Sequence, residues 1–344
     1  MARDWLLVET LGKEPAVVAL GRQLKNLVPI TTFLRRNPNL AAIQTAIAES
    51  LQNSQSMVSI TPKSRRVIRT EPVLMSDGRM HGVHVWIGPA EAEPPERPIP
   101  GPLKWDMTLG VATDTPESLV NTGRNLEVED PRRAFADIWP SGDLKPNEGK
   151  ALAAVVNSEP GHTLCDTWDS TDWQGNPIRV SFVARNGLEP GPDGRDHVIA
   201  RGMNWRADPA DPARPADRLA QQILHGLAQP GVHRALFDPT SWTLLKWLDE
   251  PCPFYDWRRV EADAPRMHPA DEARMAAMTA EFIAGATSGV LRMPGHDGDW
   301  VPVHVTVNRV EVEHETFAGL VCLRLPTATE LADAGLADSA PADD

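Results

Sequence analysis

A structural unit that occurs three times constrains the fold of this chain more than any other sequence feature. Each copy is a helix-forming segment followed by strand-forming segments that turn at a glycine. The helix-forming segments are residues 41–51, 147–156 and 269–284, and the turns are residues 76–79, 173–176 and 296–299. A long repeat of this kind indicates several small α+β modules rather than one large catalytic fold. Modules of roughly 100 residues each account for the 344 residues, so we expect no separate effector domain.

Proline-rich segments mark the boundaries between the predicted modules. Residues 89–102 and 207–216 have the composition of stiff, extended linkers. The predicted organisation is a module at residues 1–88, a linker at 89–102, a module at 103–206, a linker at 207–216, a module at 217–328 and a tail at 329–344. The tail contains five acidic residues and no basic residue, which predicts that it is disordered.

Alternating apolar residues identify the strands. Val303, Val305 and Val307 lie on one face of a predicted strand at 301–310. Short connections such as Asp77-Gly78 and Asp297-Gly298 favour antiparallel hairpins, because glycine accepts the positive φ of a tight turn. The predicted fold class is therefore α+β, with three tandem modules that each consist of an antiparallel sheet flanked by helices on one face.

Two further helices are predicted outside the repeated unit. Pro15 suits the first turn of a helix, and apolar residues follow it at near-helical spacing as far as Val28. Residues 219–227 carry a stripe of leucine and isoleucine between polar residues. We expect this stripe to pack in the core of its own module, and the alternative is contact with another module or another helix.

Charge is distributed unevenly along the chain. The net charge is −13, which argues against nonspecific nucleic-acid binding by the whole chain, yet residues 1–88 hold 11 Lys and Arg against 6 Asp and Glu. A candidate basic patch consists of Arg35, Arg36, Lys63, Arg65, Arg66 and Arg69. It is interpreted as a solvated surface or a dock for the acidic neighbouring modules, and the alternative is a site for an anionic ligand or partner.

Composition also bears on where the protein works. With 41% hydrophobic and 24% charged residues, each module can bury a normal core. The first residues lack the apolar stretch of a secretory signal, and no run approaches the ~20 apolar residues of a membrane span. Three widely separated cysteines make a disulfide framework improbable. We therefore expect a cytoplasmic protein with reduced thiols and no membrane span.

The two C-terminal modules carry motifs that resemble PAS domains. In the third module, His268-Pro269-Ala270-Asp271 resembles the motif that opens the last helix of that fold, and a glycine-turn hairpin follows it. The middle module resembles PAS in its start at 103–106, a central helix at 133–140 and late strands at 178–184 and 198–205. The first module is similar to GAF or PAS, and its long strand at 66–75 favours GAF. The whole chain resembles a mycobacterial sensor-only protein with one GAF and two PAS domains and no effector.

This resemblance implies signal sensing, signal integration or scaffolding rather than catalysis. PAS and GAF domains hold a small ligand between sheet and helices, or dimerise through the sheet and flanking helices. The Asn-Cys-Arg motif of flavin attachment does not occur, and the first module has no cysteine for a bilin. The resemblance thus implies no particular cofactor, a small ligand of unspecified identity, a separate signalling or effector protein as partner, and a chain able to form a homodimer.

Tryptophans dominate the aromatic residues and supply candidates for a ligand cavity. The chain holds 11 Trp against one Tyr and seven Phe. Most of them are expected to pack in cores, and a minority to line a cavity between helix and sheet. The candidates are Trp139, Leu152 and Trp168 in the middle module, and Phe254, Trp257, Phe282 and His304 in the third.

No catalytic constellation is predicted. His296-Asp297 superficially resembles the metal-binding pair of HD-type phosphohydrolases, but Gly298 places it in a hairpin turn rather than on a helix. Neither a nucleophile elbow nor a phosphate-binding loop has the required spacing. Three hypotheses follow: a sensor that binds a partner and a small ligand, a pure protein–protein scaffold with filled pockets, and, least favoured, a metal-dependent hydrolase.

Overall fold

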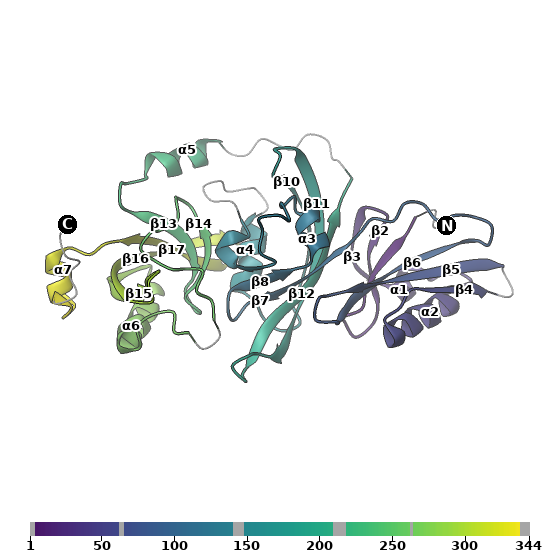
Figure 1. The fold of residues 1–344 in the computed structure, drawn as a ribbon, viewed down its shortest axis with the longest axis horizontal. Coiled ribbons are helices and arrows are strands. Elements are labelled where there is room, and N and C mark those ends of the chain that lie inside the picture. The colour runs from purple at the N-terminus through teal and green to yellow at the C-terminus, as the bar shows by residue number, and fades with distance from the viewer. Residues whose placement is uncertain (1–3, 62–64, 140–147, 209–217, 262–263, 338–344) are drawn as a thin grey trace.

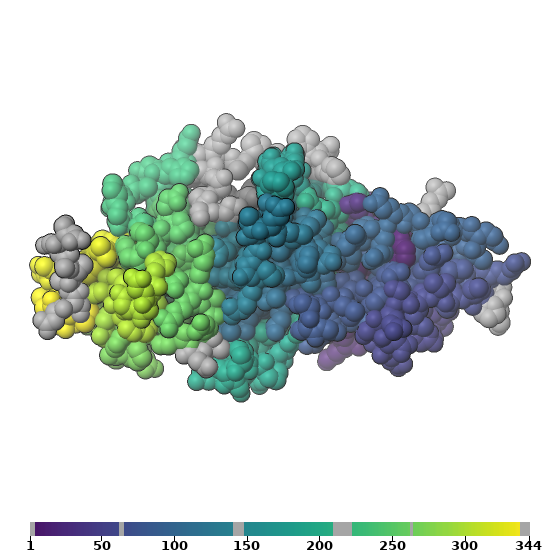
Figure 2. All heavy atoms as spheres, viewed as in Figure 1, coloured from purple at the N-terminus to yellow at the C-terminus, as the bar shows by residue number. Residues whose placement is uncertain are grey.

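The protein consists of three antiparallel sheets placed one after another along an elongated molecule (Figures 1 and 2). The computed structural model describes residues 4–61, 65–139, 148–208, 218–261 and 264–337. In the first module the elements are β1 (Leu6–Glu9), β2 (Ala16–Leu20), β3 (Gln23–Pro29), α1 (Ile30–Phe33), α2 (Leu40–Asn53), β4 (Met57–Thr61), β5 (Arg66–Leu74) and β6 (Met80–Pro89).

The middle and third modules follow in chain order. The middle module contains β7 (Gly101–Asp106), β8 (Val111–Asp114), α3 (Pro116–Asn121), β9 (Arg132–Ala134), η1 (Phe135–Asp137), α4 (Glu148–Val156), β10 (Thr163–Thr171), β11 (Pro177–Pro190) and β12 (Asp196–Arg206). The third contains α5 (Arg218–Gly226), β13 (His233–Asp238), β14 (Thr243–Trp247), η2 (Pro269–Asp271), α6 (Glu272–Phe282), β15 (Ala286–Pro294), β16 (Trp300–Glu313), β17 (Thr316–Arg324) and α7 (Ala328–Asp333).

The three sheets share one topology. Their strand orders are β3-β2-β1-β6-β5-β4, β10-β11-β12-β7-β8-β9 and β14-β13-β17-β16-β15, so the first strand of each module pairs with the last. In each module, the segment that contains α2, α4 or α6 connects one edge of the sheet to the other. Gly78, Gly175 and Gly298 adopt φ of 81°, 87° and 83° in the turns that follow. The predicted repeat, the α+β class and the antiparallel sheets are confirmed.

The helix predicted from Pro15 is wrong, because residues 15–28 form the hairpin of β2 and β3. Gly21 makes the turn at φ 58°. Val17 and Val18 are both fully buried, on opposite faces of β2. A strand buried on both faces shows no polar–apolar alternation, so its apolar spacing resembles that of a helix.

Three other expected segments also differ from the structure. The central helix expected at 133–140 is replaced by β9 and the single turn η1, and Pro140 lies outside the described residues. Ile223 on α5 and Leu227 directly after it are 52% and 63% exposed, so these members of the apolar stripe are not core residues. The expected disorder of the tail at 329–344 is contradicted as far as residue 333 by α7, where Thr327 and Glu330 form a capping box and Leu331 is buried. Residues 338–344 lie outside the described residues.

The modules pack in layers (Figure 1). The first and middle sheets lie face to face, where Leu7 and Val18 of the first module contact Met203 and Trp205 of the middle one. Helix α4 lies between the middle and third sheets, and all its residues from Ala151 to Val155 are buried. A helix that is apolar on every side must be covered on every side, and two sheets provide that cover here.

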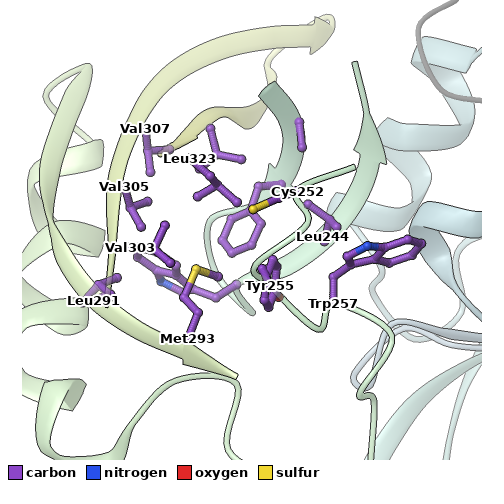
Figure 3. Close-up of a cluster of buried hydrophobic side chains, with 14 of the residues drawn as sticks. Leu244, Cys252, Tyr255, Trp257, Leu291, Met293, Val303, Val305, Val307 and Leu323 are labelled. Carbon is purple, nitrogen blue, oxygen red and sulfur yellow. The ribbon is translucent and has the colours of Figure 1, made fainter. Parts of the chain in front are cut away.

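The third sheet buries its other face against α6. Val303, Val305 and Val307 point from β16 into one cluster, as predicted, and Leu323 and Tyr255 meet them there (Figure 3). Within the residues that the structure describes, no helix is both long and apolar enough to cross a membrane.

Candidate functional site

A cavity of about 810 Å³ lies in the middle module, between the middle sheet and α4. Its floor is formed by side chains from β7, β10, β11 and β12, and its roof by Ala151, Ala154 and Val155 of α4. Residues 122–125 and the end of β10 form its sides.

The strand register explains why the floor consists of these side chains. Leu103 pairs with Gly202, and Trp105 pairs with Ala200, so they share one face of the sheet. Phe182 pairs with Asn204 on the same face. Because side chains alternate along a strand, the intervening residues point to the first module. One face of the sheet therefore joins two modules while the other lines the cavity.

The cavity wall is rich in aromatic rings. Trp168 and Phe182 stack with ring centroids 4.2 Å apart and an angle of 30° between their planes. Trp105 contacts Trp139 in an edge-to-face arrangement, with centroids 6.1 Å apart. Such walls suit an apolar, ring-containing ligand.

Charged side chains at the cavity are already paired. Arg133 donates to Asp114 over 2.6 Å, and Ser118 donates to the other oxygen of the same carboxylate. On the roof, Lys246 of the third module donates to Glu148 over 2.9 Å, and Lys246 is fully buried. A buried pair is costly to break, because removal of one partner leaves an uncompensated charge.

One polar side chain in the cavity stands apart from these pairs. Asn186 is 8% exposed and lines the cavity, since it pairs with Ala200 on the floor face. Its backbone N–H donates to His162 and its carbonyl accepts from Gly161. Its side-chain amide has no hydrogen-bond partner among the described residues. The backbone holds this residue in place while its amide lies on the cavity wall.

The predicted pocket residues of the middle module lie at or beside this cavity. Trp139 and Trp168 line it. Leu152 faces away from it, in a cluster with Leu236 and Leu245 of the third sheet. Sequence reasoning missed Trp105, Asn186 and the Asp114–Arg133 pair. The alternation of Phe182, Ala184 and Asn186 along one strand was the available signal.

The predicted pocket residues of the third module do not share one site. Phe254, Trp257 and Phe282 belong to its packed core, in which Trp257 lies on the side toward the middle module (Figure 3). His304 points to the opposite face of β16, and its Nε2 lies 3.3 Å from a Glu330 oxygen. Burial and the nearby Arg324 lower the pKa of His304.

The candidate basic residues are spread over the first module. Arg35 and Arg36 are exposed between α1 and α2, and Arg65 is exposed before β5. Arg66 and Arg69 lie three apart on β5, so they point to opposite faces of the sheet. Lys63 lies outside the described residues. The ion pairs that connect the first and middle modules use other residues, namely Glu9 with Arg185, Arg79 with Glu189, and Asp77 with Arg201.

His296 and the cysteines are the remaining candidates for metal or thiol chemistry. In the part of the chain that is described, no group of three His, Cys, Asp or Glu side chains could hold a metal. His296 lies in a hairpin turn, with Nδ1 3.9 Å from an oxygen of Asp256. Burial raises the pKa of Cys165 to about 11 and that of Cys252 to about 12. Thiols with raised pKa values are poor nucleophiles near neutral pH.

Comparisons with known proteins identify a family. The N-terminal, middle and C-terminal domains of the Rv3651-like family match residues 4–96, 99–207 and 217–334. No curated protein matches the chain. A crystal structure of an uncharacterised protein from Mycobacterium tuberculosis is 67% identical, with a TM-score of 0.84, and the match covers 97% of this chain and 99% of that chain.

Two sensory proteins show much weaker likeness. A sensory box histidine kinase/response regulator from Burkholderia thailandensis is 12% identical, with a TM-score of 0.24 over 37% of this chain and 86% of that chain. The periplasmic sensory domain of the Campylobacter jejuni chemoreceptor Tlp1 is also 12% identical, with a TM-score of 0.20 over 67% of this chain and 73% of that chain. Likeness at this level assigns neither a fold nor a function to this chain. The three domain matches and the mycobacterial relative show that this chain belongs to the three-domain Rv3651-like family.

Proposed function

We propose that this protein is a non-enzymatic sensor built from one GAF-like and two PAS-like modules, and that its middle module binds a small organic molecule. The observation that carries the proposal is the cavity of about 810 Å³ between sheet and helix. Ligand pockets commonly enclose roughly 300–1,000 Å³ and combine apolar walls with a few polar groups. The aromatic floor and the Asn186 amide have this composition.

The placement of α4 supports sensing rather than simple storage. One side of α4 roofs the cavity, and the other packs on the third sheet. Asn157, just after α4, donates to Thr316 of β17 over 2.6 Å, and Glu148 at its start pairs with Lys246. A ligand that favours one position of α4 therefore favours one placement of the third module. A cytoplasmic signalling or effector protein is the proposed recipient of that change.

A scaffold role is the second candidate, and a feature of the first module favours it. β4 is an edge strand of the first sheet, and its Val58 and Ile60 are 65% and 64% exposed. An edge strand with exposed apolar side chains can pair with a strand of another chain. In a pure scaffold this edge strand would bind the partner, and the cavity would hold no ligand.

Native mass spectrometry of gently purified protein tests the proposal. We expect the wild-type chain to retain an additional mass of a few hundred daltons. Ala154→Trp places an indole in the cavity from its roof and should abolish that retention. Lys150→Trp is the matched control, because Lys150 lies on the same helix with an exposed side chain, and it should retain the mass. A bare wild-type chain from every host tried would transfer support to the scaffold.

A further inference from the structure

The side-chain amide of Asn186 is the polar group of the cavity that most constrains the ligand. It is more than nine-tenths buried, it faces the cavity, and it is without a hydrogen-bond partner among the described residues. When no ligand is bound, water can reach this amide from the cavity, and a ligand that displaces the water loses affinity unless it pairs with the amide. The asparagine amide offers an acceptor oxygen and donor N–H groups side by side. Its complement is a ligand edge that carries one donor beside one acceptor.

The paired charges around the cavity favour an uncharged ligand. Asp114 with Arg133 and Glu148 with Lys246 are buried ion pairs. A charged ligand would leave water without meeting an unpaired opposite charge among these buried groups. Burial of a charge without such compensation is costly.

The shapes of roof and floor favour a flat ligand. Ala151 and Ala154 lie three apart on α4, so two small side chains face the cavity from one side of the helix. Opposite them lie the rings of Phe182 and Trp168 on the floor. Small side chains facing flat rings leave a slot that suits a stacked aromatic system.

We infer that the middle cavity takes a flat, uncharged aromatic molecule that presents a neighbouring donor and acceptor, as in a lactam or a carboxamide, to Asn186. This inference rests on the proposed function, because it requires that the cavity binds a ligand. Asn186 acts as the specificity-determining residue, while the aromatic floor contributes affinity without selecting the polar edge.

Two probes that differ by one methyl group test the inference. Quinolin-2-one carries the lactam N–H beside its carbonyl, and 1-methylquinolin-2-one lacks the donor. Both are titrated by calorimetry into the full chain, into Asn186→Ala, and into Asn26→Ala. Asn26 is an exposed residue of β3, so its replacement controls for a general effect of losing an asparagine.

We expect the lactam to bind about tenfold more tightly than its N-methyl analogue to the wild type and to Asn26→Ala, as one good hydrogen bond would give. In Asn186→Ala the ratio should fall to about one, with the melting temperature little changed, because the amide holds no other part of the protein. Equal affinities in the wild type, a ratio that survives Asn186→Ala, or no binding of either probe would overturn the inference. If the wild type binds both probes equally and Ala154→Trp abolishes this binding, the inference fails but the proposed function stands. If the wild type binds neither probe and retains no cellular ligand, the inference and the proposed function both fail.

Discussion

The middle and third modules share a strand order but differ in what lies between sheet and helix. In the third module, α6 places Met278 and Phe282 on the sheet, and the space is packed. In the middle module, α4 presents Ala151 and Ala154 at that position, and a cavity remains. The same topology therefore gives a packed core or an open cavity according to the size of a few helix side chains.

The two modules also differ in how the aromatic side chains of the sheet are placed. In the third module, Trp242 stacks edge-to-face with Phe237 and donates to Thr279 of α6 over 2.8 Å. This ring joins helix to sheet. In the middle module, Trp168 and Phe182 stack on each other and line the cavity instead. Aromatic content alone does not distinguish a core from a pocket.

The largest expected effect comes from truncating a large side chain in the packed core of the third module. Phe282→Ala should lower the free energy of unfolding by about 4 kcal/mol, because it removes a buried ring and leaves a void. Trp168→Ala should cost only about 1 kcal/mol, since that ring already borders open space. Urea denaturation of both variants measures the contrast. Similar losses for the two would mean that the middle cavity is not open in solution.

The boundary between these two modules can be broken at one buried ion pair. Lys246→Met removes the buried positive charge that pairs with Glu148 and should cost about 3 kcal/mol. The double variant Lys246→Met with Glu148→Leu removes both charges and should recover most of that loss. Thermal unfolding provides the measurement. A double variant as unstable as the single one would show that packing rather than charge accounts for the loss.

The boundary between the first and middle modules depends on a neutral histidine. His81 Nδ1 donates to the carbonyl of Gly202 over 2.8 Å, and Arg201 lies 3.2 Å from its Nε2, so a second proton on the ring would face a guanidinium. Burial lowers the pKa of His81 to about 4. Below pH 6.5 His81 becomes protonated in the unfolded chain, whereas in the folded chain it stays neutral down to about pH 4. The free energy of unfolding therefore decreases as the pH falls through this window.

A histidine replacement tests this pH dependence. From pH 7 to pH 5, His81 should account for roughly 2 kcal/mol of the lost stability. His81→Gln keeps a polar group of similar size and should flatten the pH profile by that amount. Denaturation at a series of pH values measures it. His84, whose pKa burial lowers to about 3, contributes in the same direction and stays unchanged as an internal reference. An unaltered slope in His81→Gln would contradict this account.

The sequence allowed the repeat, the sheets and the three-module order to be predicted, because turn glycines and strand alternation are local signals. Cavity residues were harder to predict. Trp139 and Trp257 were both predicted to line a cavity, yet Trp139 lines one and Trp257 fills a core. Whether a tryptophan borders a cavity depends on helix side chains that are distant in the chain. The hairpin at 16–29 was missed because β2 is buried on both faces by two different modules. Contacts between modules leave no local pattern.

The smallest expected effect comes from a substitution that makes the cavity roof of the middle module more like α6 of the third module. Ala154→Met introduces into the cavity roof a residue of the type that α6 uses in Met278. Because methionine is flexible and fills irregular gaps, the unliganded protein should gain up to about 1 kcal/mol from the newly buried apolar surface. Retention of a ligand should fall at the same time, since the two compete for one volume. Thermal unfolding paired with native mass spectrometry reads both quantities. A loss of stability would mean that the cavity wall cannot accept added volume, and the open space would then reflect a tightly held shape rather than small side chains.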